Sequence, residues 1–546
     1  MTRMPRIRRC LAVASAASSV LAGCTMIQPD RSADRADPGL ATPQKELEQP
    51  TSVAATEAWL EPFAINVSVK LDEMPPLCHE GNTHGDILER IRAGFALPQA
   101  EHRAIERQIR QYAAHPAYMR RVFTRALPYL HHIVEQIEAR GMPMEFALLP
   151  VVESAYDPFA YSHGRAAGLW QFIPGTGLIY ELKQNWWYDG RRDVVASTRA
   201  ALDYLEDLHE HFEGDWFLAI AAYNSGQGNV AKAIRRNTRN GQPTEFWHLR
   251  LPRETRAYLP KLLAMRELIG NPQRHGLELP SLPDRPYFAE VATHSQIDLA
   301  VAAELAGLDV EALYALNPGF NRWATDPEGP HRLLVPVANQ PRLEAGLQSL
   351  PKYERLQWNR YSVRSGDTLS VIADRFGTTV AALKKVNRLS GSTIRVSQQL
   401  MIPKASKTPE SYTLSAASRL KRTQDRERSG SKSSYTVIPG DTLWDIAMTH
   451  GISTRRLAQW NGMAPTDTLS IGTKLVLWSE NPSTSANRIR RINYVVRRGD
   501  SLSRISSRFN ISLNQLKRWN AHIAKQKYLQ PGQRLVMYVD TTNQSG

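Results

Sequence analysis

Gly366-Asp367-Thr368-Leu369 opens a pattern that returns twice, as Gly440-Asp441-Thr442-Leu443 and as Gly499-Asp500-Ser501-Leu502. Each copy begins 21 residues before an asparagine, which is Asn387, Asn461 or Asn520. A short β-type run that starts with tyrosine precedes each copy, and a second apolar run follows it. Self-similarity of this kind is typical of an array of small modules, and a row of binding modules lengthens residence on a polymer with many equivalent sites.

Each repeat predicts a strand, a Gly-Asp turn, a helix beginning at Thr or Ser, a second helix and a closing strand. The pattern resembles the LysM peptidoglycan-binding module, which implies a βααβ fold and a ligand made of the N-acetyl-hexosamine backbone of peptidoglycan or chitin. The alternative is three βααβ units without a ligand. The resemblance places the glycan beside three loops, made of Gly366, Asp367 and Thr368, of Gly440, Asp441 and Thr442, and of Gly499, Asp500 and Ser501.

The repeats set the expected boundaries of the second half: modules at 359–404, 434–479 and 493–540, with linkers at 405–433 and 480–492. A degenerate fourth repeat is expected at 284–340. Its residues Leu299, Ala303 and Asn317 align without a gap on Leu369, Ala373 and Asn387 of the first repeat. Gln296-Ile297-Asp298 replaces its Gly-Asp turn. We therefore expect a βααβ spacer that packs against the preceding domain and binds sugar weakly or not at all; an irregular linker is the alternative.

The N-terminus predicts export. Four arginines precede a short apolar stretch at 10–22, which is too short to span a bilayer and is followed by Leu21-Ala22-Gly23-Cys24. The last four residues resemble a bacterial lipobox, which implies a lipoprotein signal peptide at 1–23, a lipid-modified Cys24 and a place on the periplasmic face of the outer membrane. An ordinary secretion signal is the alternative. Residues 24–85 predict a flexible tether.

Charge and cysteine content narrow the partners. Residues 351–546 hold 32 Lys and Arg against 12 Asp and Glu, a net charge of +20, whereas the whole chain carries +15. For an exported protein we interpret this charge as attraction to the cell wall, so no nucleic acid is expected. After removal of Cys10 and acylation of Cys24, Cys78 has no partner for a disulfide. We expect a monomer.

Residues 86–275 predict an all-α domain with an N-terminal helical extension, because helical periodicity dominates and alternating strand patterns are nearly absent. Within it, Phe146-Ala147-Leu148-Leu149-Pro150-Val151-Val152-Glu153-Ser154 places one carboxylate at the end of an apolar run. Desolvation there would raise the pKa of Glu153, as a general acid requires.

Three further motifs follow in order: Gly168-Leu169-Trp170-Gln171, Ala221-Ala222-Tyr223-Asn224-Ser225-Gly226 and Glu254-Thr255-Arg256-Ala257-Tyr258. Together with Glu153-Ser154 they resemble the soluble lytic transglycosylase domain, a relative of goose-type lysozyme. The resemblance implies a lysozyme-like helical catalytic domain at 86–275, followed by α+β modules in a multidomain chain. Glu153 would be the single catalytic acid and base.

The same resemblance implies four or five substrate-binding residues. Gln171 and Asn224 would hydrogen-bond the sugar, Tyr258 would orient Glu153 or the sugar, and Tyr223 would be a wall of the groove or a core residue. Trp170 stands where many relatives carry methionine, and its larger ring would narrow a subsite. Trp186, Trp187 and Tyr188 predict either sugar-stacking rings or core.

Ordinary glycosidases use two flanking carboxylates. Beside Glu153 we expect no second catalytic carboxylate within these motifs. The nearest candidates in sequence are Asp157, which we interpret as a turn residue, and Asp193, which we interpret as a helix start. The family implies that the substrate supplies the missing group and that its 6-hydroxyl closes a 1,6-anhydro ring on N-acetylmuramic acid when the β-1,4 bond to N-acetylglucosamine breaks. A muramidase-type hydrolase and a non-catalytic peptidoglycan-anchoring protein are the alternatives. No metal or cofactor is expected, and His131-His132 is expected to be structural.

Overall fold

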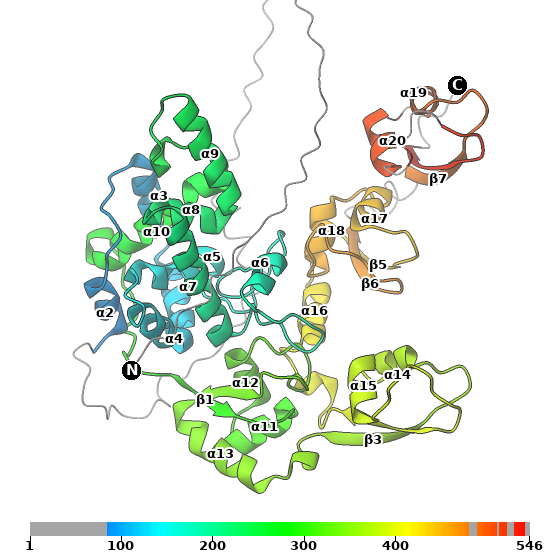
Figure 1. The fold of residues 1–546 in the computed structure, drawn as a ribbon, viewed down its shortest axis with the longest axis horizontal. Coiled ribbons are helices and arrows are strands. Elements are labelled where there is room, and N and C mark those ends of the chain that lie inside the picture. The colour runs from blue at the N-terminus through cyan, green and yellow to red at the C-terminus, as the bar shows by residue number, and fades with distance from the viewer. Residues whose placement is uncertain are drawn as a thin grey trace, which may run out of the picture. The chain divides into compact units, whose positions relative to one another are not determined.

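The computed structural model describes residues 85–479, 489–509, 511, 513–520, 523 and 529–540 (Figure 1). The signal peptide, Cys24 and residues 24–84 of the tether lie outside the described residues. Among the described residues, no helix is both long and apolar enough to cross a bilayer. The multidomain fold is confirmed: a helical domain precedes four small α+β modules.

The helical domain contains only helices and short 3-10 turns as regular elements. These are α2 (Ile87–Ala93), α3 (Arg103–Ala113), α4 (Pro116–Glu138), η3 (Met144–Leu148), α5 (Leu149–Ser154), α6 (Pro174–Ile179), α7 (Val194–His211), α8 (Trp216–Ser225), α9 (Gln227–Arg239), η4 (Phe246–His248), α10 (Arg253–Gly270) and η5 (Gln273–His275). Pro116 occupies the first turn of α4, where its missing N–H costs nothing.

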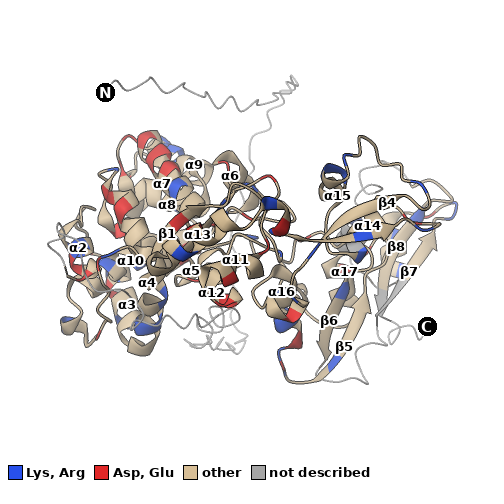
Figure 2. Cartoon of the chain, turned by 90° about the horizontal axis from the view of Figure 1, so that it is seen from below, with Lys and Arg blue, Asp and Glu red and all other residues tan. Residues whose placement is uncertain are grey.

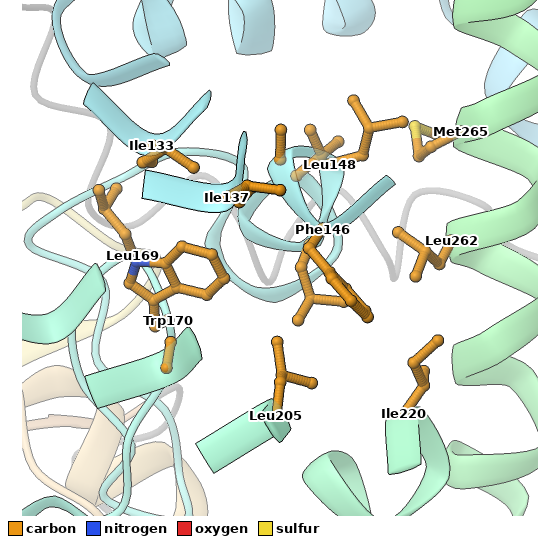
Figure 3. Close-up of a cluster of buried hydrophobic side chains, with 14 of the residues drawn as sticks. Ile133, Ile137, Phe146, Leu148, Leu169, Trp170, Leu205, Ile220, Leu262 and Met265 are labelled. Atoms are coloured by element: carbon orange, nitrogen blue, oxygen red, sulfur yellow. The ribbon is translucent and has the colours of Figure 1, made fainter. Parts of the chain in front are cut away.

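One apolar core joins these helices. Figure 3 shows Ile133 and Ile137 of α4, Phe146 of η3 and Leu205 of α7 around a common centre, and all four are buried. Glu145 is buried within the same layer, but its carboxylate accepts hydrogen bonds from the backbone N–H groups of residues 96 and 97. A buried carboxylate is tolerated where it is bonded in this way.

The three LysM repeats have the expected βααβ order. The first consists of β3 (Gln357–Ser362), α14 (Leu369–Arg375), α15 (Val380–Val386) and β4 (Gln399–Lys404). The second consists of β5 (Ser431–Thr436), α17 (Leu443–Thr449), α18 (Thr454–Trp460) and β6 (Lys474–Ser479). The third consists of β7 (Ile489–Val495), α19 (Leu502–Arg508), α20 (Leu513–Trp519) and β8 (Arg534–Asp540). In each, the two strands pair antiparallel.

The recurring asparagine joins the second helix to the closing strand. In the second repeat, Nδ2 of Asn461 donates to the carbonyls of Leu457 (2.8 Å) and Val476 (2.9 Å), and its Oδ1 accepts from Val476 N (2.7 Å). Asn387 and Asn520 make the equivalent three bonds. Since an unpaired buried backbone group costs about 1–3 kcal/mol, this asparagine explains why the spacing is fixed.

Residues 288–336 contain the same arrangement: β1 (Phe288–Ala292), α11 (Leu299–Ala306), α12 (Val310–Leu316) and β2 (Arg332–Pro336), with α13 (Gln340–Ser349) added. Asn317 makes the same three bonds, to Leu313 O (2.8 Å), Leu334 O (2.7 Å) and from Leu334 N (2.9 Å). We call this unit the LysM-like module.

The LysM-like module packs against the helical domain. Tyr129 of α4 donates to Ala315 O (2.9 Å), and Arg332 of β2 pairs with Asp193 (2.7 Å), which also caps the N-terminus of α7. Trp187 and Tyr188 belong to this contact: both are buried, beside Trp323 and Phe320. For Trp187 and Tyr188 the structure therefore supports the interpretation as core residues, whereas Trp186 is half-buried, with the Arg322 guanidinium 4.0 Å from the centre of its ring.

The segment 405–433, expected to be a linker, contains regular structure and buried side chains. It contains η8 (Pro409–Ser411) and α16 (Ala416–Asp425), and it buries Tyr412 and Leu414. Its composition, rich in Ser, Lys and Arg, favours a linker, but the two apolar side chains at its centre are buried against the LysM-like module. In the ribbon of Figure 2, positions of Asp and Glu (red) are frequent on the helical domain, and positions of Lys and Arg (blue) predominate on the LysM repeats.

Candidate active site

A cleft of about 620 Å³ is lined mainly by the helical domain, with side chains from α5, α6, α7, α8 and α10 and from the loop before α6, together with Arg455 of α18. Five of the predicted site residues line it: Glu153, Gln171, Tyr223, Asn224 and Tyr258. They come from four motifs spread over about 100 residues of sequence, and the fold joins them at one place.

Glu153 lies near the end of the short helix α5, whose other side faces the core through Leu149, Pro150 and Val151. Ser154 holds the helix end in place, because its hydroxyl donates to Leu169 O (3.0 Å). Burial raises the pKa of Glu153 to about 7, and the nearby Glu254 carboxylate adds to the rise. The carboxyl is therefore largely protonated below neutral pH and still partly protonated at pH 7, which a general acid requires.

Tyr258 is the direct partner of Glu153. Its hydroxyl donates a short hydrogen bond to Glu153 Oε1, which acts against the effect of burial and lowers the pKa of Glu153. Burial, followed by the charge of Glu153, raises the pKa of Tyr258 well above its ordinary value, so the phenol keeps its proton. Glu254, Tyr258 and Lys261 share one face of α10, at spacings of four and three residues.

Asn224 is held at the end of α8 by a neighbour from α10. Thr255 Oγ1 donates to Asn224 Oδ1 (2.8 Å). This bond fixes the orientation of the amide and uses one of the two lone pairs of its oxygen, so the NH₂ group is the donor that Asn224 offers to a ligand in the cleft. Thr255 is buried and lies on α10, which also carries Tyr258. One helix therefore positions both Asn224, through Thr255, and Glu153, through Tyr258.

Gln171 owes its place to a glycine. A Cβ on Gly168 (φ +82°) would lie 2.0 Å from the carbonyl oxygen of Arg191, so only glycine fits there. Gln171 itself has a positive φ of 49° and donates from Nε2 to Gly168 O (2.8 Å). Arg191 donates a hydrogen bond to Phe172 O (3.2 Å), next to this turn. It is buried and paired with Asp189 (2.8 Å).

The structure does not bring Trp170 to the cleft. Its ring is fully buried among core side chains (Figure 3), and its Nε1 donates to Thr198 Oγ1 (3.0 Å). The expected narrowing of a subsite by this ring is therefore wrong in this structure, because the ring points into the core. Tyr223 lines the cleft and donates to Trp170 O (2.8 Å), so it is a wall residue.

Sequence reasoning missed the second carboxylate. Glu254 lines the cleft, although it stands inside a motif already recognised. Asp157 is buried as part of a turn, where its carboxylate accepts from Phe159 N (2.9 Å), and burial raises its pKa to about 6. Asp193 caps α7, as expected. Tyr204 and Lys261 are further lining residues that carried no sequence signal.

The LysM loops use their motif side chains to build the turn. Gly440 has φ +89°, in the left-handed region that favours glycine. Asp441 accepts from Tyr435 OH (2.8 Å) and from Ile438 N (2.9 Å), and Thr442 caps α17. The other two loops repeat these contacts, through Gly366, Asp367 and Thr368 and through Gly499, Asp500 and Ser501. A role of these loops in glycan binding remains a prediction.

Within the described residues, no group of three or more His, Cys, Asp or Glu side chains could hold a metal ion. His132 packs against Phe288, with ring centroids 5.5 Å apart, and burial lowers its pKa to about 4. His131 lies beside Glu135 and Asp284. Both histidines thus belong to the packing between α4 and the elements around it.

Comparison with known proteins identifies the parts. The Transglycosylase SLT domain model matches residues 133–245, and the LysM domain model matches 361–403, 435–478 and 494–537. The model described as "Lytic transglycosylase MltD, LysM-like domain" matches residues 287–352.

Relatives extend this likeness over most of the chain. Membrane-bound lytic murein transglycosylase D of Escherichia coli is 38% identical over 421 residues, which cover 75% of this chain and 88% of that protein. A putative tributyltin chloride resistance protein of an Alteromonas species is 48% identical over 122 residues, which cover 22% of this chain and 59% of that protein.

Glu153→Gln is expected to stabilise the folded chain at pH 8 and to leave it nearly unchanged at pH 4. The pKa of Glu153 is raised from 4.5 to about 7, so between these values the folded chain binds a proton that the unfolded chain has lost. Wild-type stability therefore falls as the pH rises through this window, by about 1–3 kcal/mol, a cost that neutral glutamine avoids.

Thermal unfolding of both proteins at pH 4 and pH 8 measures this difference. Glu210→Gln, on an exposed position of α7, is the matched control and should give no such pH-dependent gain. A Glu153→Gln variant that is less stable than wild type at pH 8 would show that the cleft favours the ionised carboxylate.

Proposed function

Since this chain belongs to the family of membrane-bound lytic murein transglycosylase D, it is a peptidoglycan lytic transglycosylase, and we propose that Glu153 is its catalytic acid and base. The reaction cleaves the β-1,4 bond between N-acetylmuramic acid and N-acetylglucosamine and forms 1,6-anhydro-N-acetylmuramic acid. Family membership sets aside a purely anchoring protein. The observation that carries the assignment is a carboxyl of pKa about 7 in the cleft, hydrogen-bonded to a buried tyrosine.

In the first step, protonated Glu153 donates its proton to the glycosidic oxygen, and the bond between that oxygen and the anomeric carbon of N-acetylmuramic acid breaks. The carbonyl oxygen of the same sugar's acetamido group stabilises the positive charge that develops. Glu153 is then an anion, and the hydrogen bond from Tyr258 stabilises it.

In the second step, the Glu153 carboxylate removes the proton from the 6-hydroxyl of the same sugar, whose oxygen bonds to the anomeric carbon. The 1,6-anhydro ring closes, and Glu153 regains the proton that it had donated. Because the nucleophile belongs to the substrate, the ring closure gains from proximity. One carboxyl that titrates near neutral pH suits both steps.

Asn224 and Gln171 are proposed to bind the sugar. The NH₂ group of Asn224 suits a carbonyl acceptor, such as the acetamido group, and the bond from Thr255 fixes the orientation of the amide. Gln171 lines the same cleft from the turn made possible by Gly168. Tyr223 supplies an aromatic wall of the groove.

Glu254 supports a second candidate, a muramidase-type hydrolase on the same fold. A hydrolase requires a carboxylate that activates water opposite the acid, and Glu254 is a second carboxylate in the cleft. The oxygen found at the new sugar end separates the two reactions, because a hydrolase takes it from water.

The LysM modules bind peptidoglycan and add residence on the insoluble wall. A cell-envelope location follows from the family. Within it, we infer a lipid anchor on Cys24 that holds a monomeric chain on the periplasmic face of the outer membrane, and the lipobox-like sequence Leu21-Ala22-Gly23-Cys24 supports this inference.

The pH dependence of the reaction should respond in opposite directions to two neighbours of Glu153. Tyr258→Phe removes a hydrogen bond that lowers the pKa of Glu153, so the basic limb of the kcat/KM profile should move to higher pH. Glu254→Gln removes a charge that raises this pKa, so the limb should move to lower pH. Profiles that move together, or neither of which moves, would contradict Glu153 as the acid.

Digestion of purified sacculi in ¹⁸O-labelled water should release muramic acid ends in the 1,6-anhydro form without the label, because the 6-hydroxyl supplies the oxygen. Mass spectrometry of the products measures this. Glu153→Gln should lower the rate by at least about 10²-fold, the scale of a lost general acid. Labelled reducing ends would establish hydrolysis, with Glu254 as the residue to test next.

Cys24→Ala should release the chain from membrane fractions or leave an unprocessed precursor, since it removes the proposed acylation site. Cell fractionation with immunoblotting measures both outcomes. Cys78→Ala is the matched control and should leave membrane association unchanged. Normal processing together with full membrane association in the Cys24 variant would reject the lipid anchor.

A further inference from the structure

The segment between the first and second LysM modules is fastened to the LysM-like module. Tyr412 OH donates to the carboxylate of Asp298 (3.0 Å), and Ser406 N donates to Asp298 Oδ2 (2.7 Å). Asp298 is fully buried and also caps α11. Tyr412 and Leu414 are both buried in the apolar core of the LysM-like module. Residues 405–415 are therefore held in place by buried side chains and by hydrogen bonds to a fixed carboxylate, and we call this segment the strap.

The helix α16 continues the strap and meets three modules. Its first residue, Ala416, donates from its backbone to Asn321 O (2.9 Å) in the LysM-like module. The guanidinium of Arg419 lies 4.8 Å from the centre of the Phe159 ring in the helical domain. Gln424 donates to Asn461 Oδ1 (2.9 Å) in the second LysM module. These contacts couple that module to the catalytic domain.

A second contact joins the same two parts beside the cleft. Asp467, in the loop between α18 and β6, pairs with Arg165 Nε (2.8 Å) and accepts from Tyr161 OH (3.3 Å). The Asp467 carboxylate is also fixed by its own loop, because it accepts from Ala464 N (2.8 Å). Arg165 belongs to the loop that supplies the cleft-lining residues Ser162 and His163.

These contacts bring Arg455 of α18 to the catalytic cleft, where it lines the same cavity as Glu153. Its side chain is exposed to solvent. Burial, followed by the charge of Arg455, lowers the pKa of His163, which agrees with the closeness of the two side chains. Lys261 also lines the cleft, but it shares a helix with Glu254 and lies near Glu153. Arg455 brings a positive charge to the cleft from a separate module.

We propose that Arg455 is a substrate-binding residue of the catalytic cleft and binds a carboxylate on the peptide stems of peptidoglycan, an inference that rests on the proposed function. The glycan backbone offers hydroxyl and amide groups, whereas its peptide stems carry carboxylates, for which a guanidinium is the matching partner. The second LysM module thus completes the cleft of the enzyme as well as holding the wall.

The test compares two soluble substrates, a short glycan that carries peptide stems and the same glycan without them, in the full-length chain. Arg455→Ala should raise KM for the peptide-bearing glycan about fivefold, and Arg455→Glu by more than tenfold, as expected for loss and reversal of one ion pair. kcat, and all constants for the peptide-free glycan, should stay as in wild type. Arg455→Lys should restore part of the loss.

Arg456→Glu is the matched control, because Arg456 is an exposed neighbour on α18 that does not line the cleft. It should leave both substrates unaffected. Arg165→Glu provides an independent variant: it breaks the pair with Asp467 and should raise KM for the peptide-bearing glycan as Arg455→Ala does.

Two results would overturn the proposal: unchanged constants for Arg455→Glu on the peptide-bearing glycan, or an equal loss on both glycans. Failure of the proposed function is read separately, from the products of the wild-type enzyme on the peptide-free glycan. Absence of 1,6-anhydro ends there would refute the transglycosylase reaction itself, whatever the Arg455 variants do.

Discussion

The chemistry of this chain depends on one hydrogen bond in a desolvated place, from Tyr258 OH to the Glu153 carboxyl. Burial alone favours the neutral acid, whereas the phenol favours the anion, and the balance leaves the pKa of Glu153 at about 7. A carboxyl with this pKa gives up and regains a proton at comparable cost. The short helix α5, whose end is fixed by the Ser154 hydrogen bond, and the helix α10, which carries Tyr258, hold this pair in a defined geometry.

The βααβ modules depend on a few recurring polar residues. One asparagine joins helix to strand in each of the four units, including the LysM-like module. In the three LysM repeats, the aspartate of the Gly-Asp turn is bonded by the tyrosine that opens the repeat. The motif therefore marks a loop shape. The LysM-like module keeps the asparagine and lacks this turn, and its surface is used for contacts with the catalytic domain and with the strap.

Much of the fold and of the candidate site could be predicted from the sequence, because helical periodicity, repeat spacing and the order of the motifs indicate them. The helical block, the βααβ repeats and the cleft residues Glu153, Gln171, Asn224 and Tyr258 are where the motifs placed them. Trp170 could not be placed, since whether a ring points into the core or the groove depends on tertiary packing. Glu254 was not predicted as a cleft residue, because its motif was interpreted only through Tyr258. The strap was overlooked because two buried residues, Tyr412 and Leu414, are outnumbered by polar neighbours.

The central claim concerns the protonation of one side chain, and ¹³C NMR of the chain labelled at the glutamate carboxyl carbons tests it most directly. Comparison with Glu153→Gln assigns the resonance, and its chemical shift is then followed from pH 3 to pH 9. The account predicts a titration midpoint near 7. A midpoint near 4.5, the ordinary value for glutamate, would contradict it, because Glu153 would then be an anion at neutral pH and could not donate the proton that opens the glycosidic bond.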